Sequence, residues 1–281
     1  MIVWIRLGFS YRCEKKDISY EAAAAALLSE IPEREIRARF KKAAAEVDGI
    51  MGRLDEVYGD DRDYAFETGL LARLILSAVI EGDRHDTGAF MSGPHLRIWP
   101  EDMGPVWEGR LAYLEGKLAQ FPQETPVEKA RHAISERCRA FASREPGIFR
   151  LNVPTGGGKT LSSLRYALAH GRIYHKNRLI FVSPLLSILE QNARVIHEYV
   201  GDDGLILEHH SNVVQTGLPR EELDERELLV QSWEAPVIIT TLVQLLDTLF
   251  AGKTTAVRRF QALCGSVIVI DEVQTVPEKM L

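Results

Sequence analysis

The chain has 281 residues, of which 46% are hydrophobic and 26% are charged, and its formal net charge is −6. This length and apolar content are enough for one large domain or two modest ones, and they exclude a disordered tail as the main interpretation. The negative net charge excludes a generally basic surface that coats nucleic acid, although a local basic groove would not show in such an average.

The cysteines and the apolar segments indicate a reducing, aqueous environment. Cys13, Cys138 and Cys264 are far apart and odd in number, which is typical of a reduced cytoplasm rather than of a disulfide framework. No apolar run reaches the roughly 20 residues that span a bilayer, and the N-terminal segment lacks the pattern of a signal peptide. We therefore expect a cytoplasmic protein without a membrane partner.

The first part of the chain is predicted to be helical. Apolar residues recur three or four positions apart over residues 36–57, with charged residues between them, as in an amphipathic helix that packs on a partner. A second run, residues 66–79, is apolar around more of its circumference, which is typical of a central helix in a bundle. Glycine, proline and scattered aromatics replace this pattern over residues 88–105, where we expect the chain to cross from one unit to another. Further helices are predicted near residues 107–118 and 127–142.

After Pro146 the pattern changes to short β-branched runs that alternate with helical stretches. Continuous apolar runs of this kind belong to a parallel sheet that is covered by helices on both faces. The second half is therefore predicted to be a doubly wound α/β domain. The expected strands are residues 148–153, 179–182, 205–207, 237–240 and 267–270.

A glycine-rich loop is the strongest motif in the chain. It follows the first predicted strand and precedes a helical pattern, and it consists of Pro154, Thr155, Gly156, Gly157, Gly158, Lys159 and Thr160. Three glycines allow successive backbone N–H groups to point at phosphate oxygens, and the positive end of the helix dipole adds to the attraction. Lys159 would reach the β- and γ-phosphates, and the Thr160 hydroxyl would ligate Mg²⁺. Val153 stands where the strict pattern has glycine, but the flanking strand and helix disfavour an accidental glycine turn.

Two carboxylates follow the last predicted strand. Asp271 and Glu272 come directly after residues 267–270, which places both at the carboxyl edge of the sheet, where open α/β folds bind ligands. Asp271 would hold Mg²⁺ through its water shell, and Glu272 would orient or deprotonate the attacking water. An apolar strand that ends in Asp-Glu is by itself equally typical of a surface turn. Together with the loop, the pair predicts hydrolysis of a bound nucleotide.

Asp271-Glu272-Val273-Gln274, together with the loop, resembles the first RecA-like lobe of superfamily 2 helicases. Residues 183–193, 207–211 and 233–244 are similar to the helicase-nuclease of type I CRISPR interference, most of all to its subtype I-C form. The resemblance implies ATP and Mg²⁺ as cofactors, and an enzyme that unwinds and degrades target DNA. It also implies two partners, which are single-stranded DNA and the crRNA-guided surveillance complex.

The resemblance further implies that the N-terminal helices are the end of an HD-type metal nuclease domain. We predict that residues 1–92 form the C-terminal helical part of that domain, residues 93–125 a linker, and residues 126–281 the first RecA-like lobe. Asp83 matches the final metal-ligand aspartate, but the earlier histidine ligands have no counterpart before it, and His85-Asp86 is interpreted as incidental. Because one aspartate cannot hold a catalytic metal, a divalent transition metal is expected only if the missing ligands are supplied.

The resemblance also implies that the second RecA-like lobe lies outside this chain. In the family that lobe supplies the arginine finger, which raises the hydrolysis rate by a factor of about 10³ to 10⁵ in related phosphohydrolases. We therefore expect the isolated chain to bind ATP better than it hydrolyses it, unless the missing C-terminal lobe is supplied by a partner. The alternative is a non-enzymatic truncated remnant that binds nucleotide or DNA weakly. An unrelated P-loop kinase or transporter ATPase is disfavoured by the sequence Asp-Glu-Val-Gln.

Three further positions match the segment of the family that touches the DNA backbone. Thr240, Thr241 and Gln244 lie where a predicted strand enters a helix, and helix N-termini and hydroxyls suit phosphate contacts. The alternative is a threonine that caps the helix, and both roles can hold together.

The remaining candidates have plain structural interpretations. His209 and His210 are adjacent on an extended segment and so point to opposite sides, which disfavours a metal pair. Trp233 is expected to be a packing residue rather than a platform for base stacking. Arg131 and Gln123 are candidates for adenine recognition because they precede the loop.

Overall fold

The computed structural model describes residues 31–57, 61–92, 99–210 and 230–275, together with Ala25, Leu28 and Ser29. The chain divides into two compact units, residues 1–71 and residues 72–281. None of the helices in the described ranges is both long and apolar enough to cross a membrane.

The described part of the first unit consists of helix α3 (Glu33–Val57) and the start of helix α4 (Asp61–Ser92). Two acidic residues in the first turn of α3 suit the positive end of the helix dipole, and ion pairs one turn apart join Glu33 to Arg37 and Glu35 to Arg39. The helix predicted over residues 36–57 is confirmed. None of its described residues is buried, and Phe40 is 73% exposed.

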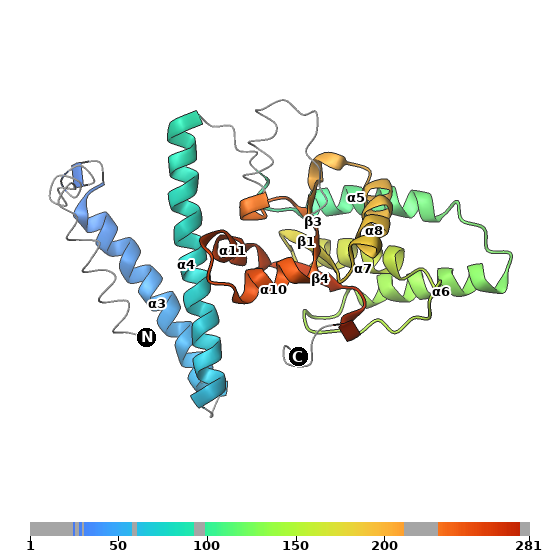
Figure 1. Ribbon diagram of the computed structural model, residues 1–281, viewed down its shortest axis with the longest axis horizontal. Coiled ribbons are helices and arrows are strands. Elements are labelled where there is room, and N and C mark those ends of the chain that lie inside the picture. Colours follow the sequence, from blue (N-terminus) through green and yellow to red (C-terminus); the bar gives the residue numbers. More distant parts are fainter. Residues whose placement is uncertain are drawn as a thin grey trace. The chain divides into compact units, whose positions relative to one another are not determined.

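The second unit is built on a four-stranded parallel sheet in the order β2-β3-β1-β4 (Figure 1). Its strands are β1 (Arg178–Ser183), β2 (Ile206–His209), β3 (Val237–Thr241) and β4 (Ser266–Ile270). The predicted α/β fold with a parallel sheet is confirmed, and four of the five predicted strands are present. The two central strands are buried on both faces, which explains why their sequences are continuously apolar.

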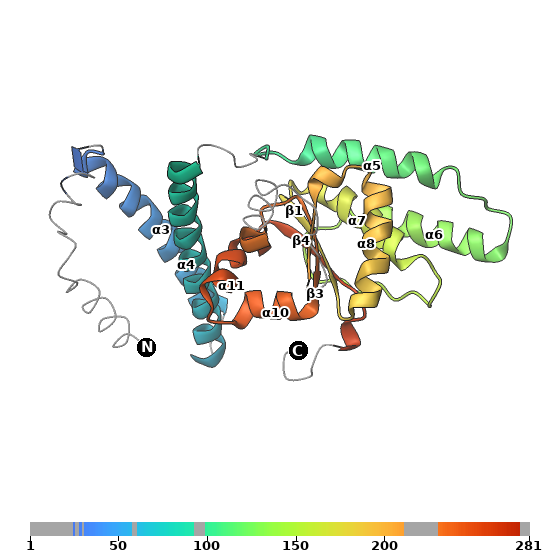
Figure 2. The ribbon, with the colours of Figure 1, turned by 45° about the horizontal axis from the view of Figure 1, so that its top comes forward.

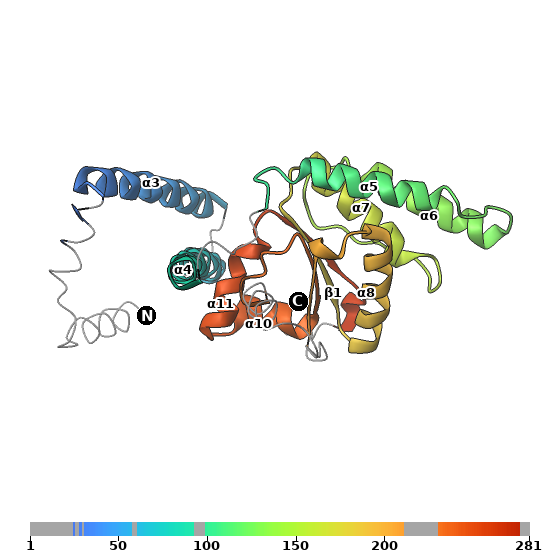
Figure 3. The same cartoon turned by 90° about the horizontal axis from the view of Figure 1, so that it is seen from above.

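Helices cover both faces of this sheet. Helices α5 (Gly104–Leu118), α6 (Pro126–Phe141), α7 (Lys159–Ile173) and α8 (Leu186–Val200) lie on one side. Helices α10 (Leu242–Phe250) and α11 (Thr254–Arg259) lie on the other (Figure 3). Alternate strand residues supply the two cores: Leu179 and Phe181 face α5, α7 and α8, whereas Ile180 and Val182 face α10.

The prediction of a strand at residues 148–153 is wrong. These residues form no ladder with the described sheet, where β4 pairs only with β1. Ile148 is fully exposed, and Phe149 and Leu151 are each 42% exposed. A β-branched sequence supplies local preference for an extended backbone, but a strand also requires a neighbouring edge to which its N–H and C=O groups can bond.

The segment predicted as a linker, residues 93–125, contains the helix predicted near residues 107–118, which is confirmed as α5 and belongs to the core of the second unit. Trp107 and Leu114 of α5 are fully buried, and the Trp107 indole donates to the Lys176 carbonyl. The buried Arg165 of α7 then joins α5 through Glu115 and α6 through Glu136. The composition of the crossing segment predicted a boundary, whereas the residues after it have the spacing of a packed helix.

Candidate nucleotide site

The glycine-rich loop leads directly into helix α7. Gly158 is the N-cap residue of α7, and no side chain caps the helix. Gly156 and Gly158 both have φ of +79°, a left-handed conformation that glycine adopts without strain. A Cβ on Gly157 would stand 2.4 Å from Val153 Cγ1 and 3.0 Å from the Pro154 carbonyl oxygen. The loop therefore requires its glycines, and it leaves the uncapped N–H groups of α7 for an anion.

Lys159 and Glu272 meet across the loop and the end of β4. Lys159 Nζ lies 3.3 Å from Glu272 Oε1, and Gln274 also donates to the Glu272 carboxylate. The hydrogen bond from Gln274, and then the bond and charge of Lys159, hold the pKa of Glu272 below its usual range. Glu272 has φ of +48°, which is uncommon for a side chain of this kind and is typical of functional turns.

A residue that the sequence analysis did not single out connects the two expected magnesium ligands. The Thr160 hydroxyl donates to Asn192 Oδ1 at 2.9 Å, and Asn192 Nδ2 donates to Asp271 Oδ2 at 3.2 Å. The same amide nitrogen donates to Ser183 Oγ at 3.2 Å. The signal that could have found Asn192 is its position on α8, three residues after buried Leu189 and four before buried Ile196, where a polar side chain points inward.

The two candidates for adenine recognition are placed differently. Arg131 Nε donates to the Gly156 carbonyl oxygen at 2.7 Å, so this arginine supports the loop. Gln123, which precedes α6, instead has its Nε2 atom 3.3 Å from Nδ1 of His132 on that helix. Neither contact tests which base the site accepts, and adenine recognition by Arg131 or Gln123 stays a prediction.

The glycine-rich loop, the paired carboxylates and the parallel sheet agree with a comparison against known families. The family model described as DEAD/DEAH box helicase matches residues 132–280, which is more than half of the chain. The chain belongs to the DEAD/DEAH box helicase family. Its match begins within α6 and includes the loop, Asn192 and both carboxylates.

The chain is also similar to a curated protein, the CRISPR-associated nuclease/helicase Cas3 of Haloferax volcanii. The two are 24% identical over 200 residues, a region that covers 59% of this chain and 21% of the relative. The chain thus spans about a fifth of the length of the relative. Together with the family match, this similarity supports the recognition of a helicase of the Cas3 kind, without deciding its subtype.

The segment expected to touch DNA lies at the start of helix α10. Thr241 is the N-cap residue, and its hydroxyl accepts from the Gln244 backbone N–H at 3.3 Å, so the capping alternative is confirmed for Thr241. Thr240 is fully buried and donates to the His209 carbonyl oxygen at 2.9 Å. Thr241 and Gln244 are partly exposed, so these two can reach a ligand at the surface and Thr240 cannot.

The two adjacent histidines have different partners. His209 Nδ1 accepts from the Trp233 indole N–H at 2.9 Å, whereas His210 Nε2 lies 3.1 Å from Glu208 Oε2. Burial, with Arg259 nearby, lowers the pKa of His209 to about 4. Trp233 is fully buried in the core on the α10 side, which confirms the prediction of a packing residue.

Asp83, the candidate ligand of a nuclease metal, is exposed on α4. Within the described ranges, no three His, Cys, Asp or Glu side chains come together as a possible metal site. The side chains of His85 and Asp86 lie outside the described residues. The structure therefore does not bring Asp83 together with further ligands in the part of the chain that it describes.

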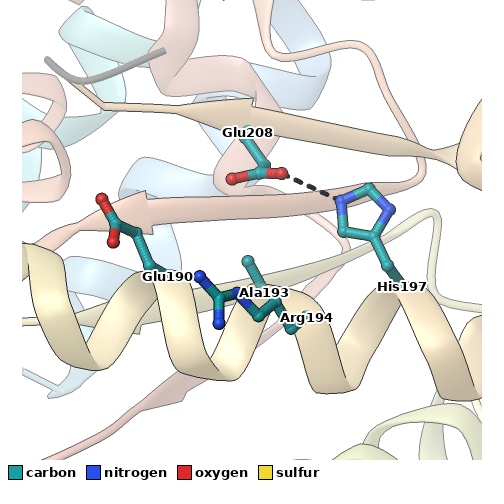
Figure 4. Close-up of a pocket in the computed structure, with 5 residues that line it drawn as sticks. All are labelled: Glu190, Ala193, Arg194, His197 and Glu208. Carbon is teal, nitrogen blue, oxygen red and sulfur yellow. Dashed lines mark hydrogen bonds and ion pairs between the residues drawn. The ribbon is translucent and has the colours of Figure 1, made fainter.

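A shallow cavity of about 400 Å³ lies between α8 and β2 (Figure 4). It is lined by Glu190, Ala193, Arg194 and His197 of the helix and by Glu208 of the strand. The His197 ring bonds Glu208 at 2.9 Å, and this hydrogen bond lowers the pKa of Glu208 to about 2. None of these residues belongs to the glycine-rich loop or to the carboxylate pair, so the cavity is separate from the candidate nucleotide site.

Proposed function

We propose that this chain is the ATP-hydrolysing and DNA-binding lobe of a helicase that acts in CRISPR interference. The observation that carries the proposal is the convergence at the carboxyl edge of the sheet: Lys159 lies 3.3 Å from Glu272, and Asn192 joins Thr160 to Asp271. The family match supports nucleotide and nucleic-acid binding. The similarity to Cas3 supports the CRISPR context and a crRNA-guided complex as partner.

The residues of this site fit a magnesium nucleotide. The loop cannot accommodate a side chain at Gly157, and the first N–H groups of α7 have no side-chain cap, so the backbone offers donors for phosphate oxygens. A hydroxyl and a carboxylate, from Thr160 and Asp271, share one amide partner, and such oxygen ligands suit Mg²⁺. The bound MgATP would supply the transferable phosphoryl group and a divalent charge that stabilises the negative charge on its oxygens.

The chain's own residues have distinct roles in this proposal. The backbone of Thr155, Gly156, Gly157 and Gly158 binds phosphate oxygens, Lys159 donates to them, and Thr160 and Asp271 hold the metal. Glu272 orients a water molecule and accepts its proton. Since Lys159 and Gln274 both lower the pKa of Glu272, the carboxylate becomes a better base when either contact is released.

The test is calorimetric titration of the purified chain with ATP in the presence of Mg²⁺, comparing the parent with Lys159→Ala. The matched control is Lys129→Ala, which removes the same side chain from an exposed position on α6. We expect binding by the parent and by the control, and loss of binding in Lys159→Ala. Equal affinity of all three proteins, or no binding by the parent, would refute the proposed nucleotide site.

Hydrolysis is then measured with and without single-stranded DNA. The proposal expects slow turnover that requires Glu272, so Glu272→Gln should bind ATP and hydrolyse none. A turnover that survives Glu272→Gln would show that another residue, or a contaminating enzyme, is responsible. Adding a candidate C-terminal helicase lobe to the same assay tests whether that partner raises the rate.

A further inference from the structure

Arg259, the last residue of α11, is a buried cation without a carboxylate partner. Its residue is 7% exposed, its Nε atom is buried without a hydrogen bond, and no described carboxylate forms an ion pair with it. Its guanidinium lies over the Trp233 ring, 5.2 Å from the centroid, and burial lowers the pKa of Arg259. A buried charge of this kind is costly unless something compensates it.

The guanidinium donates to the side chain of Gln244 in the first turn of α10. Arg259 Nη1 lies 3.0 Å from Gln244 Oε1 and 3.2 Å from Nδ1 of the neutral His209 ring. Helices α10 and α11 lie side by side on one face of the sheet (Figure 2). A guanidinium has donors only, so the carbonyl oxygen of the amide must face it and the NH₂ group must face away. This chemistry determines the orientation of the Gln244 amide.

The NH₂ group of Gln244 is available to a ligand. None of the described residues accepts a hydrogen bond from Gln244 Nε2. This nitrogen is also not buried, because the buried side-chain atoms that lack a partner do not include it. The backbone N–H of Gln244 donates a hydrogen bond to the Thr241 hydroxyl. Both ends of Gln244 are therefore fixed, and its side-chain donor is accessible at the carboxyl end of β3.

We infer that Arg259 is a positioning residue for nucleic-acid binding, which acts through Gln244. Arg259 fixes the amide and polarises it, and Gln244 Nε2 then donates to a phosphate oxygen of the DNA backbone. A hydrogen bond accepted by an amide oxygen strengthens the donor capacity of its NH₂ group, and glutamine is a common phosphate contact. The negative backbone in turn compensates the buried cation. This inference rests on the proposed function, because it presumes that the chain binds DNA.

A double-mutant cycle tests the link between the two residues. Affinity for a fluorescein-labelled oligothymidylate is measured by anisotropy for the parent, Gln244→Ala, Arg259→Gln and the double variant. Each single change should weaken binding about tenfold or more, the value of one hydrogen bond to a charged group. The double variant should bind no more weakly than Gln244→Ala. Losses that multiply in the double variant would show that Arg259 does not act through Gln244, and would overturn the inference.

The variant Gln244→Glu separates DNA binding from stability without removing the buried group. The new carboxylate would pair with Arg259 and raise the melting temperature, but it would present an oxygen instead of a donor to phosphate. We expect DNA affinity to fall more than in Gln244→Ala. The charge-matched control is Gln191→Glu, on exposed α8 surface across the sheet, which should affect DNA binding far less. Unchanged DNA affinity in Gln244→Glu would overturn the inference.

The salt dependence distinguishes positioning from direct contact. A cation that touches a single-stranded phosphate contributes about 0.7 to the slope of log affinity against log salt concentration. Arg259→Gln should weaken binding at every salt concentration without changing that slope, and a slope reduced by about 0.7 would overturn the positioning role. If the parent chain binds no oligothymidylate, the proposed function fails together with this inference. If the parent chain binds but the free-energy losses of the two single variants add up in the double variant, only this inference is refuted and the proposed function stands.

Discussion

Asn192→Ala is expected to weaken the binding of MgATP while leaving the binding of metal-free ATP nearly unchanged. The amide accepts from the Thr160 hydroxyl at 2.9 Å and donates to Asp271 Oδ2 at 3.2 Å. It contacts neither Lys159 nor a backbone N–H of the loop among the described residues. The substitution therefore releases the two proposed metal ligands and retains the groups that we propose bind phosphate.

The magnitude follows from the two hydrogen bonds that orient the metal ligands. Each contributes about 1 kcal/mol net, so losing both costs about 2 kcal/mol, or about 30-fold in affinity for MgATP. Changes to residues that orient metal ligands typically cost about 10- to 100-fold, which agrees with this value. Alanine also favours a helix more than asparagine does, so the helix itself should not be weakened.

The assay is calorimetric titration with ATP in Mg²⁺ and, separately, with ATP in a chelator. Gln191→Ala is the matched control, because it removes an exposed polar side chain from the neighbouring position of α8. Equal losses of affinity with and without Mg²⁺ would refute the reasoning, because they would show that Asn192 supports the phosphate loop instead. Unchanged MgATP affinity would refute it as well.

Asn192→Asp provides an independent check on the same contact. A carboxylate oxygen would then face Asp271 Oδ2 at the 3.2 Å now spanned by the amide nitrogen. The repulsion is at most about 5 kcal/mol for an effective dielectric constant of about 20, and solvent reduces it because both residues are partly exposed. The variant should melt below the parent, and Mg²⁺ alone should raise its melting temperature more than that of the parent.

Three further outcomes are expected. Gly157→Ala should lose about tenfold or more in ATP affinity, measured by titration, because its Cβ would stand 2.4 Å from Val153 Cγ1 and the loop must shift. Glu81→Gln should lower the free energy of unfolding by about 3 kcal/mol in urea titrations, because it leaves the 6%-exposed Arg258 guanidinium without its carboxylate. The pKa of His209 is about 4 in the fold and about 6.5 in the unfolded chain, so the neutral ring stabilises the protein above pH 6.5. That contribution, at most about 3 kcal/mol, should disappear as the pH falls from 6.5 to 4, and His209→Gln should flatten the urea-unfolding profile over that interval.

The parts of the site that contiguous motifs carry could be predicted from the sequence. A backbone cradle for phosphate needs glycines directly before Lys159, and two carboxylates at the edge of a sheet must follow an apolar strand. These requirements involve only a few neighbouring residues, so they can be recognised in the sequence. Glu272 directly follows β4, and the structure places it 3.3 Å from Lys159 at the start of α7.

The elements that were missed depend on packing between distant segments. Residues 148–153 have the composition of a strand, but no described edge pairs with them. The helix near residues 107–118 is predicted, but it is assigned to a linker, whereas Trp107 and Leu114 are fully buried against the rest of the second unit. Burial and pairing are decided by which surfaces meet, and local preference does not contain that information.

The two amides at the carboxyl edge explain a more general limit. Asn192 touches a carboxylate that can only accept, and Gln244 touches a guanidinium that can only donate, so a charged neighbour fixes the orientation of each amide. Motif searches favour charged residues because phosphate and metal chemistry requires charge. A neutral amide next to such a residue carries no charge itself, yet it decides where the free hydroxyl, carboxylate or NH₂ group points. In this chain both amides lie on helices that follow strands of the sheet. Their contacts with Asp271 and Arg259 join segments that are distant in the sequence, so only the tertiary structure shows the role of the two amides.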